Sequence, residues 1–375
     1  MKTRILAVAA SLVLAVVLIR ATHWIRVASQ PEARTIPPAT NPGQQPARSV
    51  NRVSSRAPLS EDVASPNPNP SPSATNNWLA RLMSTNPTTE LPREAIDRWL
   101  SSGHTNAEDL LAARQAGGGM DFLRMALTNH PNDPRVLLAA MALNDGPEAT
   151  RERLDRFKAA APENSLADYL SARDNLKNGR PDEAVADLLA ASRKTSFNDY
   201  MLDAMQNAED LYLQSGKSPA EAKALGAATA LLPHLVQFKG LAQDMAALQR
   251  QYLASGDTAS AENLARMGTQ LGQQLIEGEG SKTLIGQLVG AAIERIVLSP
   301  LDPAKTYDFL QGTIPDRTAQ LDANRTATRQ RAQFLDQWTR NASDAELISY
   351  FDRFKMYGES AAMQWVQTRG KRMDP

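Results

Sequence analysis

The chain has 375 residues, with 41 Lys and Arg against 41 Asp and Glu, and no cysteine. The balanced charge leaves no overall positive field to hold a nucleic-acid backbone, so we expect no nucleic-acid partner. The missing cysteines exclude disulfides, thiol catalysis and cysteine-ligated zinc. Ala, Leu and Met carry the apolar content while aromatic residues make up only 5%, which favours helices over sheets.

The N-terminus has the order of a membrane-targeting segment. Lys2 and Arg4 precede an apolar run at residues 5–19. Fifteen helical residues span about 22 Å, a length closer to a signal peptide than to a membrane span. Against cleavage, no small-x-small site follows directly, and Trp24 with nearby arginines is typical of an interfacial anchor. We therefore expect residues 1–29 to be a signal peptide or a signal anchor, leaving both alternatives open, with contact to a membrane.

Residues 30–77 have the composition of a disordered linker. They contain ten prolines and many Ser, Asn, Thr and Gln, with almost no large apolar residues. Such a segment cannot bury enough apolar surface to offset the entropy of ordering. We expect an extended tether there, followed by a helical-repeat domain at residues 78–375.

Helix starts and stops recur from residue 91 onward. Ser218 with Glu221, Ser343 with Glu346, and Thr105 with Glu108 have the spacing of capping boxes. The helix that begins near Thr105 is expected to end at the three glycines of residues 117–119. The C-terminal segment, from about residue 299 to 375, is expected to form helices that cap the domain.

An internal repeat organises the middle of the chain. The pattern Leu-x-x-Gly ends at Gly146, Gly179, Gly216 and Gly256, at intervals of 33, 37 and 40 residues. The stripe Met201, Met205, Ala208 and Tyr212 aligns with the stripe Leu241, Met245, Leu248 and Tyr252. Both stripes have the i, i+4, i+7, i+11 spacing of one helix face. The pattern predicts helix–turn–helix units with a positive-φ glycine at each corner.

One unit carries a family resemblance. Ala172 is the small residue of a first helix, Gly179 to Ala184 forms a Gly-x-x-x-x-Ala turn, and Leu188 and Ala191 follow on a second helix. This pattern resembles the tetratricopeptide repeat, most clearly over residues 131–196, with repeated units extending to residue 256. The resemblance implies an all-α fold, a right-handed α-solenoid of antiparallel helix pairs, and a protein or peptide partner bound along the first helices.

Residues 283–298 are apolar enough to suggest a membrane span. Their short length and the presence of Gln287, Glu294 and Arg295 favour a buried helix of the domain instead. Gly268 with Gly272, and Gly286 with Gly290, have the spacing that lets two helices approach closely.

The sequence shows no recognisable catalytic chemistry. The segment from Gly278 to Thr283 lacks the glycine that a phosphate loop places directly before its lysine. The four histidines are scattered, without the spacing of metal ligands. We therefore expect no enzyme activity, no catalytic residue, no cofactor, no metal and no small-molecule substrate.

The leading hypothesis is a scaffold for protein–protein interaction, anchored in a membrane or secreted, with its helical domain outside the cytoplasm and periplasmic if the source is bacterial. Tyr169 and Arg173, one turn apart on a first helix, are the candidate residues of a peptide groove. Two alternatives remain open: a structural or assembly subunit that self-associates, and an unrecognised cell-envelope enzyme.

Overall fold

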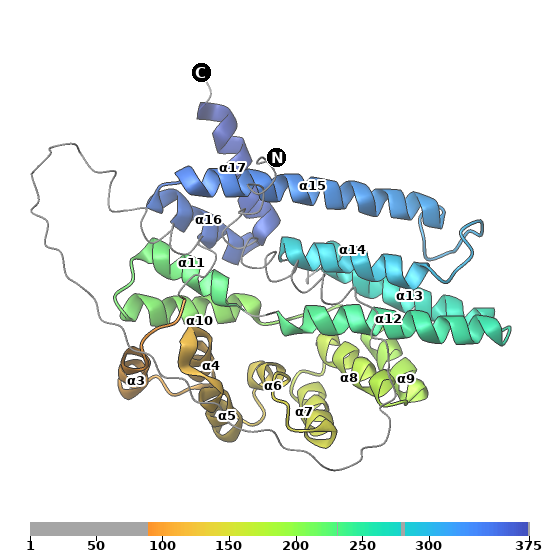
Figure 1. Ribbon diagram of the computed structural model, residues 1–375, viewed down its shortest axis with the longest axis horizontal. Coiled ribbons are helices and arrows are strands. Elements are labelled where there is room, and N and C mark those ends of the chain that lie inside the picture. The colour runs from red at the N-terminus through yellow and green to blue at the C-terminus, as the bar shows by residue number, and fades with distance from the viewer. Residues whose placement is uncertain (1–88, 231, 279–281, 374–375) are drawn as a thin grey trace, which may run out of the picture.

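The computed structural model describes residues 89–230, 232–278 and 282–373 (Figure 1). These residues form helices joined by short turns, and they contain no β-strand, only isolated bridges such as Asn164 with Ser196. The elements are α3 (Arg93–Ser101), α4 (Ala107–Ala113), the π-turn η2 (Arg114–Gly118), α5 (Met120–Asn129), α6 (Pro134–Ala140), α7 (Pro147–Ala160), α8 (Ser165–Lys177), α9 (Pro181–Ser192), α10 (Met201–Gln214), α11 (Pro219–Thr229), α12 (Pro233–Ala254), α13 (Thr258–Ile276), α14 (Leu284–Leu298), α15 (Ile314–Asn341), α16 (Asp344–Tyr357) and α17 (Glu359–Met373). The all-α prediction is confirmed for this part of the chain. The targeting segment and the tether lie outside the described residues.

The four repeat glycines lie at helix corners, as predicted. Gly146, Gly179, Gly216 and Gly256 have φ values of 103°, 72°, 86° and 82°. The corners after α8, α10 and α12 share one hydrogen-bond pattern, in which the residue after the glycine donates to a carbonyl five positions back, as Asp257 does to Tyr252 at 2.8 Å. This closure satisfies helix-end carbonyls and needs a left-handed residue, which glycine adopts without strain.

Two of the three predicted helix starts are confirmed and one is wrong by a residue. Ser343 and Glu346 form a reciprocal capping box on α16, and the Ser218 side chain accepts from the backbone N–H of Glu221. At α4 the cap is Asn106, paired reciprocally with Asp109, and not Thr105 with Glu108. Asn is preferred over Thr at the N-cap position, which agrees with the shift of one residue. The shift frees Glu108 for a different contact.

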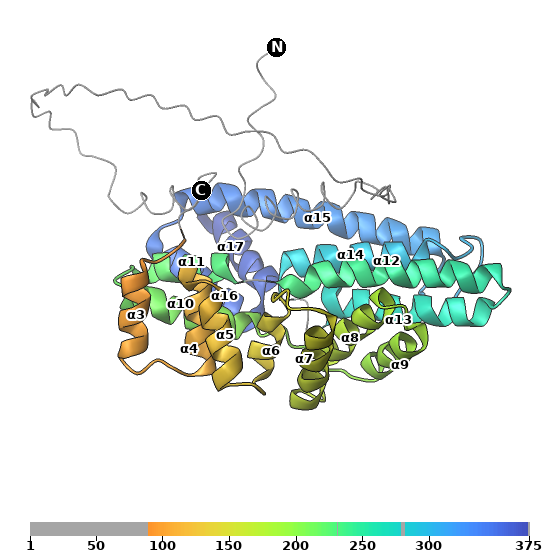
Figure 2. The same ribbon diagram turned by 60° about the horizontal axis from the view of Figure 1, so that its bottom comes forward.

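The chain runs out along one layer and then folds back over it (Figure 2). Helices α4 to α9 contact one another in sequence order, each packing on the next. The later hairpins do not extend this row. Instead α10 packs on α4, and α12 packs on α8, while α13 contacts α9. Helix α11 packs on α16, which in turn packs on α17.

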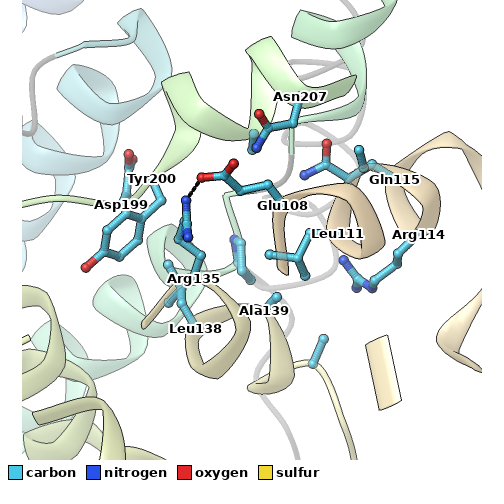
Figure 3. Close-up of a pocket in the computed structure, with 14 residues that line it drawn as sticks. Glu108, Leu111, Arg114, Gln115, Arg135, Leu138, Ala139, Asp199, Tyr200 and Asn207 are labelled. Atoms are coloured by element: carbon cyan, nitrogen blue, oxygen red, sulfur yellow. Dashed lines mark ion pairs between the residues drawn. The ribbon is translucent and has the colours of Figure 1, made fainter. Parts of the chain in front are cut away.

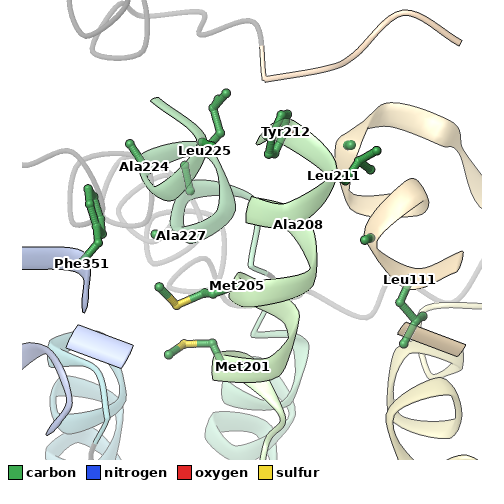
Figure 4. Packing of buried hydrophobic residues seen from close by; sticks show 14 of the residues in the cluster. Leu111, Met201, Met205, Ala208, Leu211, Tyr212, Ala224, Leu225, Ala227 and Phe351 are labelled. Atoms are coloured by element: carbon green, nitrogen blue, oxygen red, sulfur yellow. The ribbon is translucent and has the colours of Figure 1, made fainter. Parts of the chain in front are cut away.

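Two large apolar clusters follow from this arrangement. The first joins α3 to α6 with α10, α11 and α15 to α17, and the second joins α6 to α9 with α12 to α14. The predicted α10 stripe is fully inside the first cluster, with Met201, Met205, Ala208 and Tyr212 each at most 4% exposed (Figure 4). In the aligned stripe of α12, Tyr252 is only partly buried.

Helices α13 and α14 approach closely at their glycines, as the sequence predicts. A Cβ added at Gly290 would lie 2.5 Å from the carbonyl oxygen of Gly272, and one added at Gly272 would lie 2.4 Å from Cγ of Glu294. Helix α14 is packed within the second cluster. No helix in the described part of the chain combines the length and apolar character needed to cross a bilayer.

The C-terminal region, expected to be helical from about residue 299, becomes helical at α15. Residues 299–313 form an irregular segment, in which Leu301, Tyr307 and Leu310 make a small apolar cluster. The 28-residue α15 then spans the molecule above α14 (Figure 1). Arg317 at its start makes a two-pronged ion pair with the buried Glu294 of α14, with both N–O distances 2.7 Å.

Candidate functional site

Tyr169 and Arg173 both face α12. The Tyr169 side chain is 0% exposed and its ring lies edge-on to Phe238 of α12, with the ring centroids 5.9 Å apart. Arg173 forms an ion pair with Asp244, and its guanidinium occupies the space that a Cβ on Gly240 would need. The chain's own α12 therefore covers the surface where these two residues were expected to meet a peptide. Contact between Tyr169 and a partner would require α12 to move.

An open groove lies elsewhere, along the contact between α4 and α10. Two adjoining hollows form it, and both are lined by Glu108 of α4 and Asn207 of α10. We call these two hollows together the α4–α10 groove. On α10 the groove extends from Tyr200 to Gln214, a distance of about 21 Å at the helical rise. That length suits a short segment of polypeptide.

The first hollow lies where α4, η2, α6 and the start of α10 meet (Figure 3). It encloses about 90 Å³, which suits a side chain or a few water molecules. Its apolar wall is supplied by Leu111, Leu138, Ala139 and Ala142. Polar groups stand around this wall, and Pro233 of α12 closes one side.

The second hollow lies toward the other end of α10. Its volume is about 340 Å³, and its polar lining consists of Glu108, Asp109 and Asp210 together with His104, Asn207 and Gln214. Trp99 of α3 forms part of the wall and stacks on His104, with the ring centroids 3.6 Å apart. The indole nitrogen of Trp99 is buried without a hydrogen-bond partner.

An ion pair marks the centre of the groove. Glu108, freed by the shifted helix cap, pairs with Arg135 of α6 (Figure 3). Arg135 also donates to the Asp133 carboxylate at 2.6 Å. Asp133 in turn caps α6 by accepting from the backbone N–H of Arg135. This network fixes the position of Arg135 and compensates its charge within the protein.

Two polar side chains of the π-turn η2 lack partners. Arg114 and Gln115 line the first hollow, and both Nε of Arg114 and Oε1 of Gln115 are buried without a hydrogen bond. Burial lowers the pKa of Arg114 from its ordinary value. The turn exists because the chain ends α4 at three successive glycines, with Gly117 at φ 103°.

Tyr200, on the opposite wall, has a strained backbone. It is the one non-glycine residue with positive φ (55°) in the described part of the chain. Asn164 holds this conformation from α8: its side chain accepts from the N–H of Asn198 at 3.0 Å and donates to the carbonyl of Asn198 at 2.7 Å. Strain that the surrounding structure enforces is typical of functional sites. It therefore adds to the case for the first hollow.

Neither a metal centre nor a catalytic group stands out among the described residues. They hold no group of three or more His, Asp and Glu side chains arranged to bind a metal ion. His234 is buried, which lowers its pKa, and its Nε2 lies 3.5 Å from an Asp199 oxygen. In the segment compared with a phosphate loop, Thr283 caps α14 by accepting from the N–H of Gly286 at 3.0 Å.

The groove residues could not be found from the sequence. The two walls come from helices about 100 residues apart, and no local pattern links Glu108 or Gln115 to Asn207. The one local signal is the run of three glycines after Gln115, which marks an unusual helix end. Comparison with known proteins adds no relative: the chain matches no protein-family model, no curated protein and no solved structure.

Proposed function

We propose that this chain is a scaffold that binds a segment of another protein in the α4–α10 groove. The observation that carries the proposal is the first hollow, where unpartnered polar groups of a π-turn face an apolar wall and a strained Tyr200. Buried polar groups without partners destabilise a protein unless a ligand satisfies them. A peptide supplies both the apolar side chains and the hydrogen-bonding groups that this hollow lacks.

The architecture in this proposal resembles an array of tetratricopeptide repeats. Helices α4 to α9 form three successive pairs, and the clearest repeat, α8 with α9, has its glycine corner at Gly179. On this reading α4, α6 and α8 are the first helices of the three pairs, and they line the inner face of a right-handed solenoid. Helices α10 and α12 partly cover that face. The α4–α10 groove is then the part of that face that remains open.

We further propose that the domain works outside the cytoplasm. The support is the N-terminal sequence, with Lys2 and Arg4 before the apolar run at residues 5–19. The linker composition of residues 30–77 suits a spacer between a membrane and the helical domain.

The test is to fill the first hollow. Ala204 of α10 lines it, and Ala204→Trp would place an indole where the partner is expected. The matched control is Ala323→Trp on the exposed surface of α15. Proteins that co-purify with the full-length chain from its native source are quantified by mass spectrometry. We expect their amounts to fall at least tenfold with Ala204→Trp and to stay unchanged with Ala323→Trp.

Equal recovery with all three chains, each shown by circular dichroism to be folded, would rule out the groove as the binding site. Light scattering on the same samples tests the competing function, self-association. A specific observation favours that alternative: Met356 and Tyr357, at the end of α16, are 68% and 65% exposed. A chain that is monomeric and still binds partners contradicts it.

A further inference from the structure

The charges of the α4–α10 groove reverse from one end to the other. The first hollow contains Arg114, whose guanidinium has no ion-pair partner in the described part of the chain. The charge of Arg135, in the same hollow, is already compensated by Glu108 and Asp133. A partly buried, unpaired guanidinium is unfavourable in the free protein, and an anion that binds it regains that free energy through charge-assisted hydrogen bonds.

Gln115, beside Arg114, indicates that the anion belongs to a peptide. Its buried Oε1 accepts no hydrogen bond, so it is available for an N–H donor. A peptide offers a carboxylate and a backbone N–H in one ligand, which matches the guanidinium of Arg114 and the amide oxygen of Gln115 together. One π-turn thus presents a donor for a carboxylate and an acceptor for an amide.

The second hollow has the opposite character. Its lining includes no Lys or Arg, and of its three carboxylates Glu108 is paired with Arg135 and Asp109 caps α4, so Asp210 is the one without an ion-pair or capping role among the described residues. Trp99, which is 6% exposed, is a second feature of this wall, and its buried indole N–H has no acceptor among the described residues. A bound segment would satisfy it with a backbone carbonyl, while a basic side chain of the same segment meets the carboxylates.

The spacing between the two ends sets a register. Tyr200 borders the first hollow and Asp210 the second, ten residues apart along α10, or about 15 Å. An extended chain covers that distance in about four to five residues. We propose that the groove recognises a polypeptide segment with a carboxylate at Arg114 and a basic residue about four to five positions away, near Asp210. This inference rests on the proposed function and specifies the partner's chemistry.

The experiment is a selection from a random dodecapeptide library against the immobilised full-length chain, after depletion on the Ala204→Trp chain. We expect the selected peptides to carry Asp, Glu or a free C-terminal carboxylate, with Lys or Arg four to five positions from it. Selection on Arg114→Gln should lose the acidic preference alone, and selection on Asp210→Asn the basic preference alone.

Affinities of one selected peptide give the quantitative check. We expect Arg114→Gln to weaken binding about 10- to 100-fold, the usual range for a lost charge-assisted hydrogen bond, and Arg114→Lys to weaken it less. The melting midpoint of Arg114→Gln should not fall, because the residue has no partner to lose. A lower midpoint would mean that Arg114 has a structural role, and would overturn the assignment.

The two proposals fail in different ways. One outcome is a set of peptides that bind the wild-type chain and not Ala204→Trp, yet show no charge preference. In that case the proposed register is wrong and the groove remains a binding site. If no peptide distinguishes the wild-type chain from Ala204→Trp, the groove does not bind polypeptide, and both proposals are overturned.

Discussion

Glu359, at the start of α17, is 1% exposed and accepts a hydrogen bond from the backbone N–H of Leu284 at 2.8 Å. Burial raises its pKa to about 7, against the opposing effect of that hydrogen bond. The folded protein therefore holds this proton more tightly than the unfolded chain does. The resulting stabilisation is fully present below pH 4.5, the ordinary pKa, and is lost as the pH rises through about 7.

Glu359→Gln should remove this pH dependence while keeping an acceptor for Leu284. The difference between a pKa of 4.5 and one of about 7 corresponds to a change in unfolding free energy on the order of 3 kcal/mol. Between pH 4.5 and 8 the stability of the variant should therefore rise by up to that amount relative to the wild type. Urea unfolding at several pH values measures the difference. The exposed Glu183, replaced by Gln, is the control. A variant that tracks the wild-type pH profile would contradict the prediction.

Single-residue features were predictable where the chemistry is local. The corner glycines after α8, α10 and α12 follow from hydrogen bonds that span six residues, and the Ser343 cap from one that spans four. Asn106 caps α4 in place of Thr105, in line with the stronger N-cap preference of Asn. Tyr169 and Arg173 were correctly placed on one helix face, but their spacing contains no information about α12, which covers them.

At the scale of elements, α15 is attached to α14 by one buried ion pair. Glu294 is 0% exposed, and burial raises its pKa, although its hydrogen bonds with Arg317 oppose that shift. Arg317→Met would leave the carboxylate buried and unpaired, and we expect the unfolding free energy to fall by about 3 to 5 kcal/mol. Denaturant titration measures the loss.

A second variant separates the ion pair from mere packing. Arg317→Met combined with Glu294→Met removes both charges and should recover most of the stability, because no charge is then left buried. Arg266, whose pair with Asp308 is exposed, is the matched control, and Arg266→Met should change stability by less than about 1 kcal/mol. A double variant no more stable than the single one would contradict this explanation.

The whole molecule departs from the stack that nearest-neighbour repeats suggest. The apolar stripes of α10 and α12 predicted that these faces are buried, and they are, except that Tyr252 is only partly buried. A stripe cannot specify which helix buries it, because any apolar partner gives the same hydrophobic free energy. The return of α10 to α4 and of α12 to α8 was therefore not predictable, and neither was the groove that depends on it.

This fold-back predicts that the described domain unfolds as one unit. Leu127 and Leu232 pack against both apolar clusters, which couples them. Phe238→Ala leaves a cavity in the second cluster and should lower the unfolding free energy of the domain by about 3 to 5 kcal/mol. Trp99, Trp338 and Trp365 all belong to the first cluster, so their fluorescence reports on the other half.

With Trp24 and Trp78 replaced by Phe, the fluorescence and circular-dichroism transitions of Phe238→Ala should shift together. Leu189→Ala, at a 44%-exposed position, should shift neither. A fluorescence transition that stays at the wild-type denaturant concentration would show that the two halves unfold separately.

The hydrogen bond from the Tyr212 hydroxyl to the carbonyl of Thr89, at 2.6 Å, joins residues 123 positions apart. In an array with only adjacent contacts, each helix pair can settle as it leaves the ribosome. Here the face of α4 that packs on α10 stays uncovered until α10 is made, roughly 100 residues later, or about 5 to 20 s of synthesis. The nascent chain must therefore keep its first helices from aggregating during that interval, and its folding should be slower than that of a simple repeat of equal length.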